Sequence, residues 1–153
     1  MKFENITVID NHVIATPGQR IVAGIIDLVV YGVVAVVLGV VFRLFGLGGL
    51  GETIALLYLF LRDSLHGLGY QSFGKKVIGL KVLYREARPV SYLDGLKRNF
   101  IFLPNLLGLW LGYGAGGLTL LLVLIELYFL FTSDDHQRLG DRLANTIVTR
   151  YEK

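Results

Sequence analysis

Long apolar runs separated by short charged segments dominate the chain. Residues 21–42 contain one charged residue, Asp27, and residues 99–133 also contain one, Glu126. A helix needs about 20 apolar residues to cross the hydrocarbon core of a bilayer. The first run therefore predicts a membrane-spanning helix over about 18–42. A weaker apolar run predicts a second span over about 48–65.

The apolar run over 99–133 is too long for a single span. At 1.5 Å per residue it would extend about 52 Å, against a hydrocarbon core of about 30 Å. The glycine-rich stretch 112–117 divides it into spans over about 99–113 and 115–132. Both are close to the lower length limit, so a re-entrant hairpin is the alternative. Pro104 is expected to kink or offset the third span.

Basic residues give these spans an orientation. The segment 62–98 holds eight of the 15 Lys and Arg residues, and the tail after residue 133 holds four. Basic loops remain on the cytoplasmic side of a membrane. The whole chain, 1–153, is thus predicted to be one all-α membrane domain with four transmembrane helices in two hairpins, N-in and C-in. The cytoplasmic parts are then residues 1–17, 66–98 and 133–153.

Local patterns predict some structure in the cytoplasmic parts. The stretches "TPGQ" (16–19) and "SYLD" (91–94) each have the pattern of a helix start with a capping box. The segments 75–86 and 145–152 are β-branched and partly alternating, which favours a small β-ribbon. For "SFGKKVIGL" (72–80) an interfacial amphipathic helix is an equal alternative.

Composition supports a membrane protein and excludes several other classes. The chain is 54% hydrophobic and 18% charged, with a mean hydropathy of +0.60, whereas a soluble domain has about 25% charged residues. It contains no cysteine, which excludes disulfides, thiolate nucleophiles and cysteine metal sites. No nucleophile–base pair stands out, so we expect no enzyme activity, cofactor or metal. Topology and anionic lipid already explain the basic middle segment, so we expect no nucleic-acid partner.

Asp27 is the first candidate functional residue. A carboxylate at the centre of a membrane helix costs roughly 2.5–3.5 kcal/mol. Arg20 lies seven residues earlier, on the same helix face and about 10.5 Å away along the axis. Asp27 is either an ion or proton site or a structural bond to a neighbouring helix. Arg20 either reaches the membrane interface or pairs with an acidic partner or a lipid phosphate.

A second intramembrane carboxylate, Glu126, has the same two interpretations. Together with Asp27, and with Glu52 near the start of the second span, it could form a carboxylate relay. Small residues that let helices approach closely form a separate group. They fit either packing within one subunit or a homo-oligomer, and they are Gly24, Gly108, Gly112 and Gly116.

Several motifs together resemble the RDD family of small bacterial membrane proteins. The family is named for an arginine and two aspartates, which here match Arg20 and Asp27 in "PGQRIVAGIID" and Asp141 in "HQRLGDRLANTIV". Two further segments, "GYQSFGKKVIGLKVL" (69–83) and "LKRNF" (96–100), match other family motifs. The resemblance covers about residues 13–150.

The resemblance implies a multi-pass protein of the bacterial cell membrane, and it allows two functions. In the first, the chain is a cation/proton transporter of the Na⁺/H⁺ exchange type, in which Asp27 binds the monovalent cation or proton. Arg20 and Asp141 then act as gating or charge-balancing partners. A subunit of this size would need a homo-oligomer for alternating access.

In the second function, the chain is a non-transporting scaffold or accessory protein. An Arg20–Asp141 ion pair then ties the tail to the first helix, and Asp27 is a buried hydrogen-bonding group. The basic middle segment binds membrane lipids or a partner membrane protein. The residues expected to make those contacts are Gly74, Lys75, Lys76 and Arg98.

Overall fold

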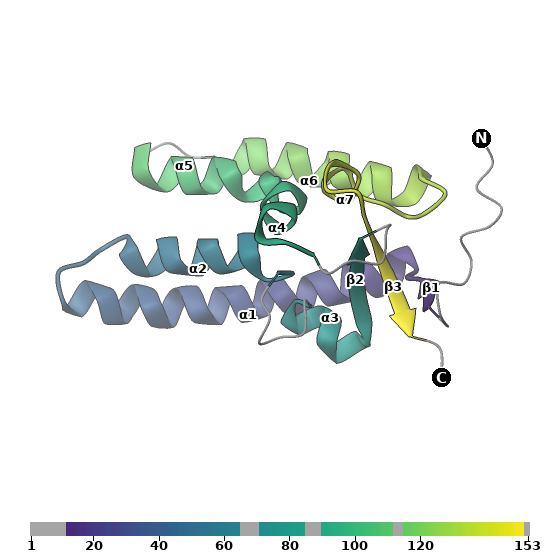
Figure 1. Cartoon of the computed structure of the whole chain (residues 1–153). Helices are drawn as coiled ribbons and strands as arrows, with labels where there is room; N and C mark the ends of the chain where they lie inside the picture. Colours follow the sequence, from purple (N-terminus) through teal and green to yellow (C-terminus); the bar gives the residue numbers. More distant parts are fainter. Residues whose placement is uncertain (1–11, 65–70, 85–89, 112–114, 152–153) are drawn as a thin grey trace.

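Two helical layers and a small sheet make up the part of the chain that this computed structural model describes. The described residues are 12–64, 71–84, 90–111 and 115–151. One layer holds helix α1 (Pro17–Leu44) and helix α2 (Leu50–Leu61), which returns along it. The other layer holds α5 (Leu103–Leu111) and α6 (Gly116–Thr132), above the first in Figure 1. The predicted mostly helical fold is confirmed.

Helix α1 begins where its capping box is predicted. The Thr16 hydroxyl accepts a hydrogen bond from the Gln19 N–H at 3.3 Å, and the Gln19 side chain accepts one from the Thr16 N–H at 3.0 Å. Pro17 follows at the first helical position, where its missing N–H costs nothing. Among the described helices, α1 alone is long and apolar enough to cross a membrane by length and composition.

The other apolar helices are shorter than the predicted spans. Helix α2 has 12 residues, α5 has 9 and α6 has 17. Helix α5 is short because the chain enters it through α4 (Tyr92–Arg98) and a 3₁₀ turn, η2 (Phe100–Phe102). Pro104 lies in the first turn of α5, so it offsets this helix from α4 and does not kink it.

The second predicted helix start is also present. The Ser91 N–H donates to Asp94 Oδ2 at 3.0 Å, and the Asp94 N–H donates to Ser91 Oγ at 3.2 Å. This capping box begins α4, as the "SYLD" pattern predicts.

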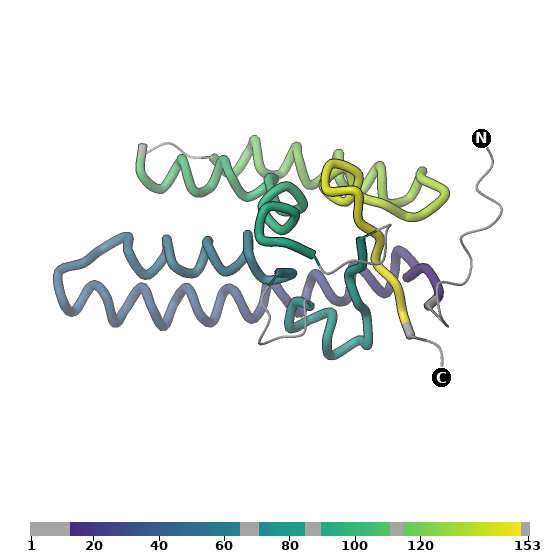
Figure 2. Tube along the Cα trace, viewed as in Figure 1, coloured from purple at the N-terminus to yellow at the C-terminus, as the bar shows by residue number. Residues whose placement is uncertain are grey.

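The predicted β-ribbon is part of a three-stranded antiparallel sheet with strand order β1-β3-β2. Strand β2 (Leu80–Tyr84) pairs with β3 (Thr146–Tyr151), with Val82 opposite Val148. A strand that the sequence does not predict, β1 (His12–Ile14), lies on the other edge of β3. The Cα trace in Figure 2 shows strand β3 running beside β1, just before the start of helix α1.

The stretch 72–80 contains both structures that its pattern allows. Helix α3 (Phe73–Ile78) is capped by Ser72, and strand β2 starts two residues after the helix ends. Gly79 joins them with φ of +75°, a left-handed conformation that ends helices and favours glycine.

Two apolar clusters hold the elements together. One packs the sheet against the first turns of α1, and its members include Ala15, Ala23, Leu80, Val82 and Val148. The other joins the layers through Leu56, Leu59, Phe60, Ile101 and Phe102. Within it the Phe60 and Phe102 rings meet edge to face at 6.4 Å, a favourable aromatic geometry.

Candidate functional site

A buried ionic network lies where the two helical layers meet the short elements. Eight of its nine side chains are buried, and the ninth, Arg138, is 18% exposed. They come from α1, the end of α2, α3, α4, α6 and the short helix α7 (Leu139–Leu143) with its cap. Its members are Arg20, Asp27, Arg62, Asp63, Lys75, Arg98, Glu126, Arg138 and Asp141.

Asp141 is the centre of one half of this network. Its carboxylate contacts Arg20, lies 3.0 Å from Arg98 Nη2 and 3.4 Å from Arg138 Nη2. It also caps α7 by accepting the Arg138 N–H at 3.1 Å. Burial alone would raise the pKa of the Asp141 carboxyl, but the three arginines outweigh burial and hold that pKa well below its ordinary value. Arg20 also donates to the His136 carbonyl, so the tail is fixed to the first turn of α1.

Asp63 is the centre of the other half. Lys75 Nζ lies 2.5 Å from Asp63 Oδ1, and Arg98 Nε lies 3.4 Å from Asp63 Oδ2. Arg98 therefore bridges the two halves, and its Nη1 donates to Thr146 Oγ1 at 2.7 Å. Burial lowers the pKa of the Lys75 amine to about 7, although the Asp63 carboxylate favours the charged form.

Asp27 connects α1 to α3 and to the end of α2. Its Oδ1 accepts the Gly74 N–H at 2.7 Å, and its Oδ2 lies 3.3 Å from Arg62 Nη1. A Cβ at Gly74 would overlap the Ala23 carbonyl. Glycine is therefore required for α3 to approach α1 closely enough to make this hydrogen bond.

Glu126 makes the corresponding connection between α6 and α7. Its Oε1 accepts the Gly140 N–H at 2.8 Å, and its Oε2 lies 3.4 Å from Arg138 Nε. Gly140 packs against the Arg98 carbonyl so closely that a Cβ would overlap it. Asp27 and Glu126 thus each accept the backbone N–H of a close-packed glycine and pair with an arginine.

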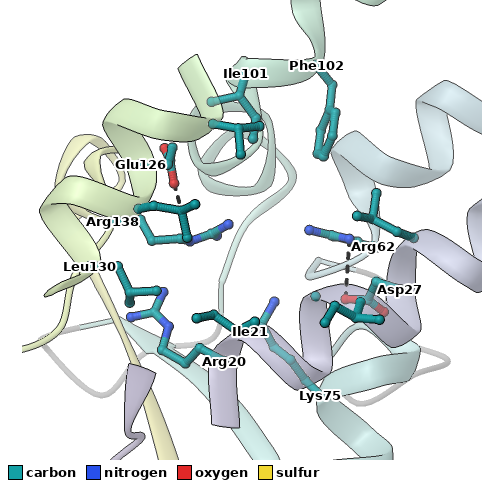
Figure 3. A pocket seen from close by; sticks show the side chains of 15 residues that line it. Arg20, Ile21, Asp27, Arg62, Lys75, Ile101, Phe102, Glu126, Leu130 and Arg138 are labelled. Atoms are coloured by element: carbon teal, nitrogen blue, oxygen red, sulfur yellow. Dashed lines mark ion pairs between the residues drawn. The ribbon is translucent and has the colours of Figure 1, made fainter. Parts of the chain in front are cut away.

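Arg20, Asp27 and Glu126 line one cavity of about 230 Å³ between α1 and α6. Figure 3 shows Asp27 and Glu126 on opposite sides, with the Arg62 and Arg138 guanidinium groups extending toward one another between them. Glu52 lies elsewhere, beside the turn after α1, where it pairs with Arg43 at 2.6 Å. Asp27 and Glu126 therefore face one cavity with two arginines between them, and Glu52 lies apart from both.

The residues expected to contact lipid or a partner differ in their burial. Lys75 and Arg98 are buried and neutralise Asp63 and Asp141, and Gly74 is buried against α1. Only Lys76 of this set is exposed. Lys75 and Arg98 are buried because Asp63 and Asp141 are buried. A carboxylate inside the protein is costly unless a cationic side chain pairs with it.

Two of the predicted packing glycines face open space within the described chain, and the homo-oligomer interpretation stays a prediction. A Cβ added at Gly24 or Gly116 would meet no atom within 4 Å, so neither makes a close contact. Gly108 is half-buried in α5, and Gly112 lies outside the described residues. Among the glycines that the structure describes, an added Cβ would come within 3.0 Å of another atom at Gly51, Gly74, Gly95 and Gly140.

Three network members, Arg62, Asp63 and Arg138, were not singled out from the sequence. Arg62 and Asp63 follow directly after an apolar run as an adjacent pair of opposite charges. Such a pair fits a solvated helix end as well as a buried network, so the sequence signal is ambiguous. Within the described residues, no group of three or more His, Asp and Glu side chains is arranged to hold a metal ion.

Comparisons with known proteins give one clear result. No curated protein matches the chain, and no solved structure matches it. The model of the RDD family matches residues 14–145, a range that includes Arg20, Asp27 and Asp141. The match covers most of the chain and agrees with the family that the motifs resemble. The chain belongs to the RDD family.

Proposed function

We propose that this RDD protein is a multi-pass scaffold of the bacterial cell membrane that binds lipid or a partner protein and does not transport ions. Four helices in two hairpins, N-in and C-in, cross or enter the bilayer. The buried ionic network holds the cytoplasmic layer of α3, α7 and the sheet against the membrane helices. Family membership and the apolar helix α1 indicate a membrane protein.

Exposed apolar side chains support this placement. On α1 they include Val29, Val33, Val36, Val37, Val40 and Val41, and on α5 and α6 they include Leu107, Trp110, Leu118, Leu120, Leu121 and Leu124. Asp27 lies about 25 Å from the C-terminal end of α1 and about 15 Å from its start, at 1.5 Å per residue. This distance puts Asp27 near the cytoplasmic edge of the apolar belt, where a buried charge costs less than at the bilayer centre.

The observation that carries the proposal is that each candidate ion-binding carboxylate already has partners within the protein. Asp27 already binds the Gly74 N–H and Arg62, and Glu126 binds the Gly140 N–H and Arg138. A cation entering the cavity would have to separate these pairs, and it would approach the four cationic side chains that line the cavity. Like charges at short range oppose such binding.

The alternative function, cation/proton exchange, is favoured by one observation. Asp27 and Glu126 both line the same cavity between α1 and α6, and acids beside a cavity at membrane depth commonly mark proton or ion pathways. Homo-oligomer formation remains part of this alternative, because a single small subunit offers little room for alternating access.

Proton and Na⁺ flux in reconstituted liposomes separates the two functions. We expect wild-type protein to give no flux above protein-free vesicles. Flux that is lost in Asp27→Asn but retained in Glu52→Gln, which removes a carboxylate at the far turn, would establish the transporter instead.

Cysteine labelling tests the topology directly, because the natural chain has no cysteine. Phe45 and Lys76 are both exposed, so single variants Phe45→Cys and Lys76→Cys are suitable. We expect a membrane-impermeant maleimide to label Phe45→Cys in intact cells, and Lys76→Cys only after lysis. Labelling of both from one side contradicts the hairpin topology.

A further inference from the structure

The cavity between α1 and α6 has an unusual lining for a site beside a membrane. Four cationic side chains and two carboxylates face it, from Arg20, Arg62, Lys75, Arg138, Asp27 and Glu126. The rest of the lining is apolar, including Ile25, Leu28, Phe102, Val123 and Leu127. Its volume of about 230 Å³ is far larger than the 10–15 Å³ or so that holds one water.

Arg62 has hydrogen-bonding capacity that the described protein does not use. Its side chain is 5% exposed and lies within the lining. Its Nη1 lies 3.3 Å from Asp27 Oδ2, yet Nε and Nη1 make no hydrogen bond with any residue that the structure describes. Figure 3 shows this guanidinium extending into the cavity. A buried donor without an acceptor is costly, so this side chain favours an anionic ligand.

The charges of the network favour the same ligand. Four arginines and Lys75, whose pKa is about 7, face four carboxylates, so the network has one positive charge in excess while Lys75 is protonated. Planar guanidinium groups bind phosphate oxygens through two parallel N–H donors. One singly charged phosphate group between Arg62 and Arg138 would therefore balance the network and accept the free Arg62 N–H groups.

The apolar rim indicates where such a phosphate comes from. Ile25 and Leu28 line the cavity and are also 55% and 52% exposed on the outer face of α1. In the proposed orientation this face meets the acyl chains of the cytoplasmic leaflet. We propose that the cavity binds the phosphate of an anionic phospholipid, with an acyl chain leaving past Ile25 and Leu28. This step rests on the proposed membrane placement.

Binding of short-chain lipids to the purified full-length chain in neutral detergent tests the site. The titrants are dihexanoyl-phosphatidylglycerol, dihexanoylglycerol, which lacks the phosphate, and inorganic phosphate. We expect the phosphatidylglycerol to bind, the diacylglycerol to bind at least about tenfold more weakly, and inorganic phosphate to compete only weakly. Tenfold corresponds to the loss of one charge-assisted hydrogen bond.

A pair of matched double variants identifies the residues. Arg62→Gln with Asp27→Asn neutralises the cavity pair without leaving a buried charge alone. Arg43→Gln with Glu52→Gln neutralises the exposed pair at the far turn. We expect the first to weaken phosphatidylglycerol binding at least about tenfold and the second to leave it unchanged. If the first double variant does not fold, Arg62→Lys keeps the charge but loses the planar fork, and a severalfold weaker affinity is expected.

The possible results separate cleanly. Equal affinity for the diacylglycerol, or wild-type affinity in the folded cavity variant, overturns the phosphate site. Inorganic phosphate that binds as tightly as the lipid, with the same dependence on Arg62, supports the phosphate site and overturns the lipid source. If the wild-type chain does not bind phosphatidylglycerol but the expected cysteine labelling is observed, this inference fails and the proposed placement stands. If Phe45→Cys and Lys76→Cys are labelled from the same side, the proposed placement fails.

Discussion

Two of the ion pairs that join helix α1 to other parts of the chain, one near each end of the helix, have opposite environments. Near the start of α1, Arg20 pairs with Asp141, and their side chains are 5% and 0% exposed. Near its end, Arg43 pairs with Glu52, and their side chains are 69% and 23% exposed. Water screens the second pair, whereas the first must be satisfied by protein alone.

The difference teaches what buried charge does in this fold. An exposed pair contributes about 0–1 kcal/mol and is screened by salt. A buried network gives little net stability compared with apolar packing, but removing one member leaves other charges unpaired. Asp141, Asp63 and their arginines therefore specify which short segments attach to the long helices α1 and α6. The following predictions test this contrast in order of expected effect.

Arg98→Gln should have the largest effect, because Arg98 is fully buried between Asp63 and Asp141. We expect a loss of about 3–5 kcal/mol in the free energy of unfolding, the cost of breaking a buried ionic network. Denaturant unfolding in detergent, followed by circular dichroism, measures this loss. Arg150→Gln, which removes an exposed arginine from β3, is the control and should change little.

Acid should weaken the Asp141 half of the network selectively. The pKa of the Asp141 carboxyl is lower in the folded protein than its ordinary value of 3.8. Its stabilising contribution is therefore complete above about pH 4–5 and is lost as pH falls through the folded pKa. In thermal unfolding, Asp141→Asn should be less stable than the wild type at pH 7. Between pH 5 and about pH 2, its stability should fall less steeply than that of the wild type. Parallel pH profiles for the two proteins would contradict this role.

Gly140→Ala should cost about 1–3 kcal/mol, because the added methyl group meets the Arg98 carbonyl. Gly32→Ala is its counterpart in α1, where the added group meets nothing within 4 Å. That variant should gain about 0.5–1 kcal/mol through better helix propensity. Thermal unfolding of both variants gives the comparison, and changes of the same sign would show that the contact at Gly140 is not tight.

Arg43→Gln should have the smallest effect, below about 1 kcal/mol, because its ion pair is largely exposed. Raising the salt concentration should reduce even this difference between the variant and the wild type. A loss comparable to that of Arg98→Gln would remove the contrast between the two ends of α1.

Local sequence signals predict the local parts of this structure. The capping boxes at Thr16 and Ser91 involve residues within one helical turn, so four letters are enough to recognise each. The pairing of β2 with β3 follows from the alternating pattern of both segments. The family motifs add Asp141, and the structure pairs it with Arg20.

The partners of the buried charges lie in segments that are distant in the sequence. Local patterns therefore do not predict which residues pair. Arg98 and Lys75 belong to a basic segment whose charge already satisfies the topology rule, so nothing local marks them as buried. Close-packed glycines present the same problem. A Cβ added at Gly74 would overlap α1, whereas one added at Gly24 would meet no atom within 4 Å. The neighbouring sequence does not distinguish the two glycines.

The strand order β1-β3-β2 also sets a sequence of events during synthesis. Strand β3 lies between the two other strands and is made after both, so neither edge strand has its partner until β3 emerges. Arg20 and Asp141 are 121 residues apart, which corresponds to roughly 6–24 s of translation at 5–20 residues per second. During that interval Arg20 is without Asp141, and their ion pair forms only after the later segment has been made.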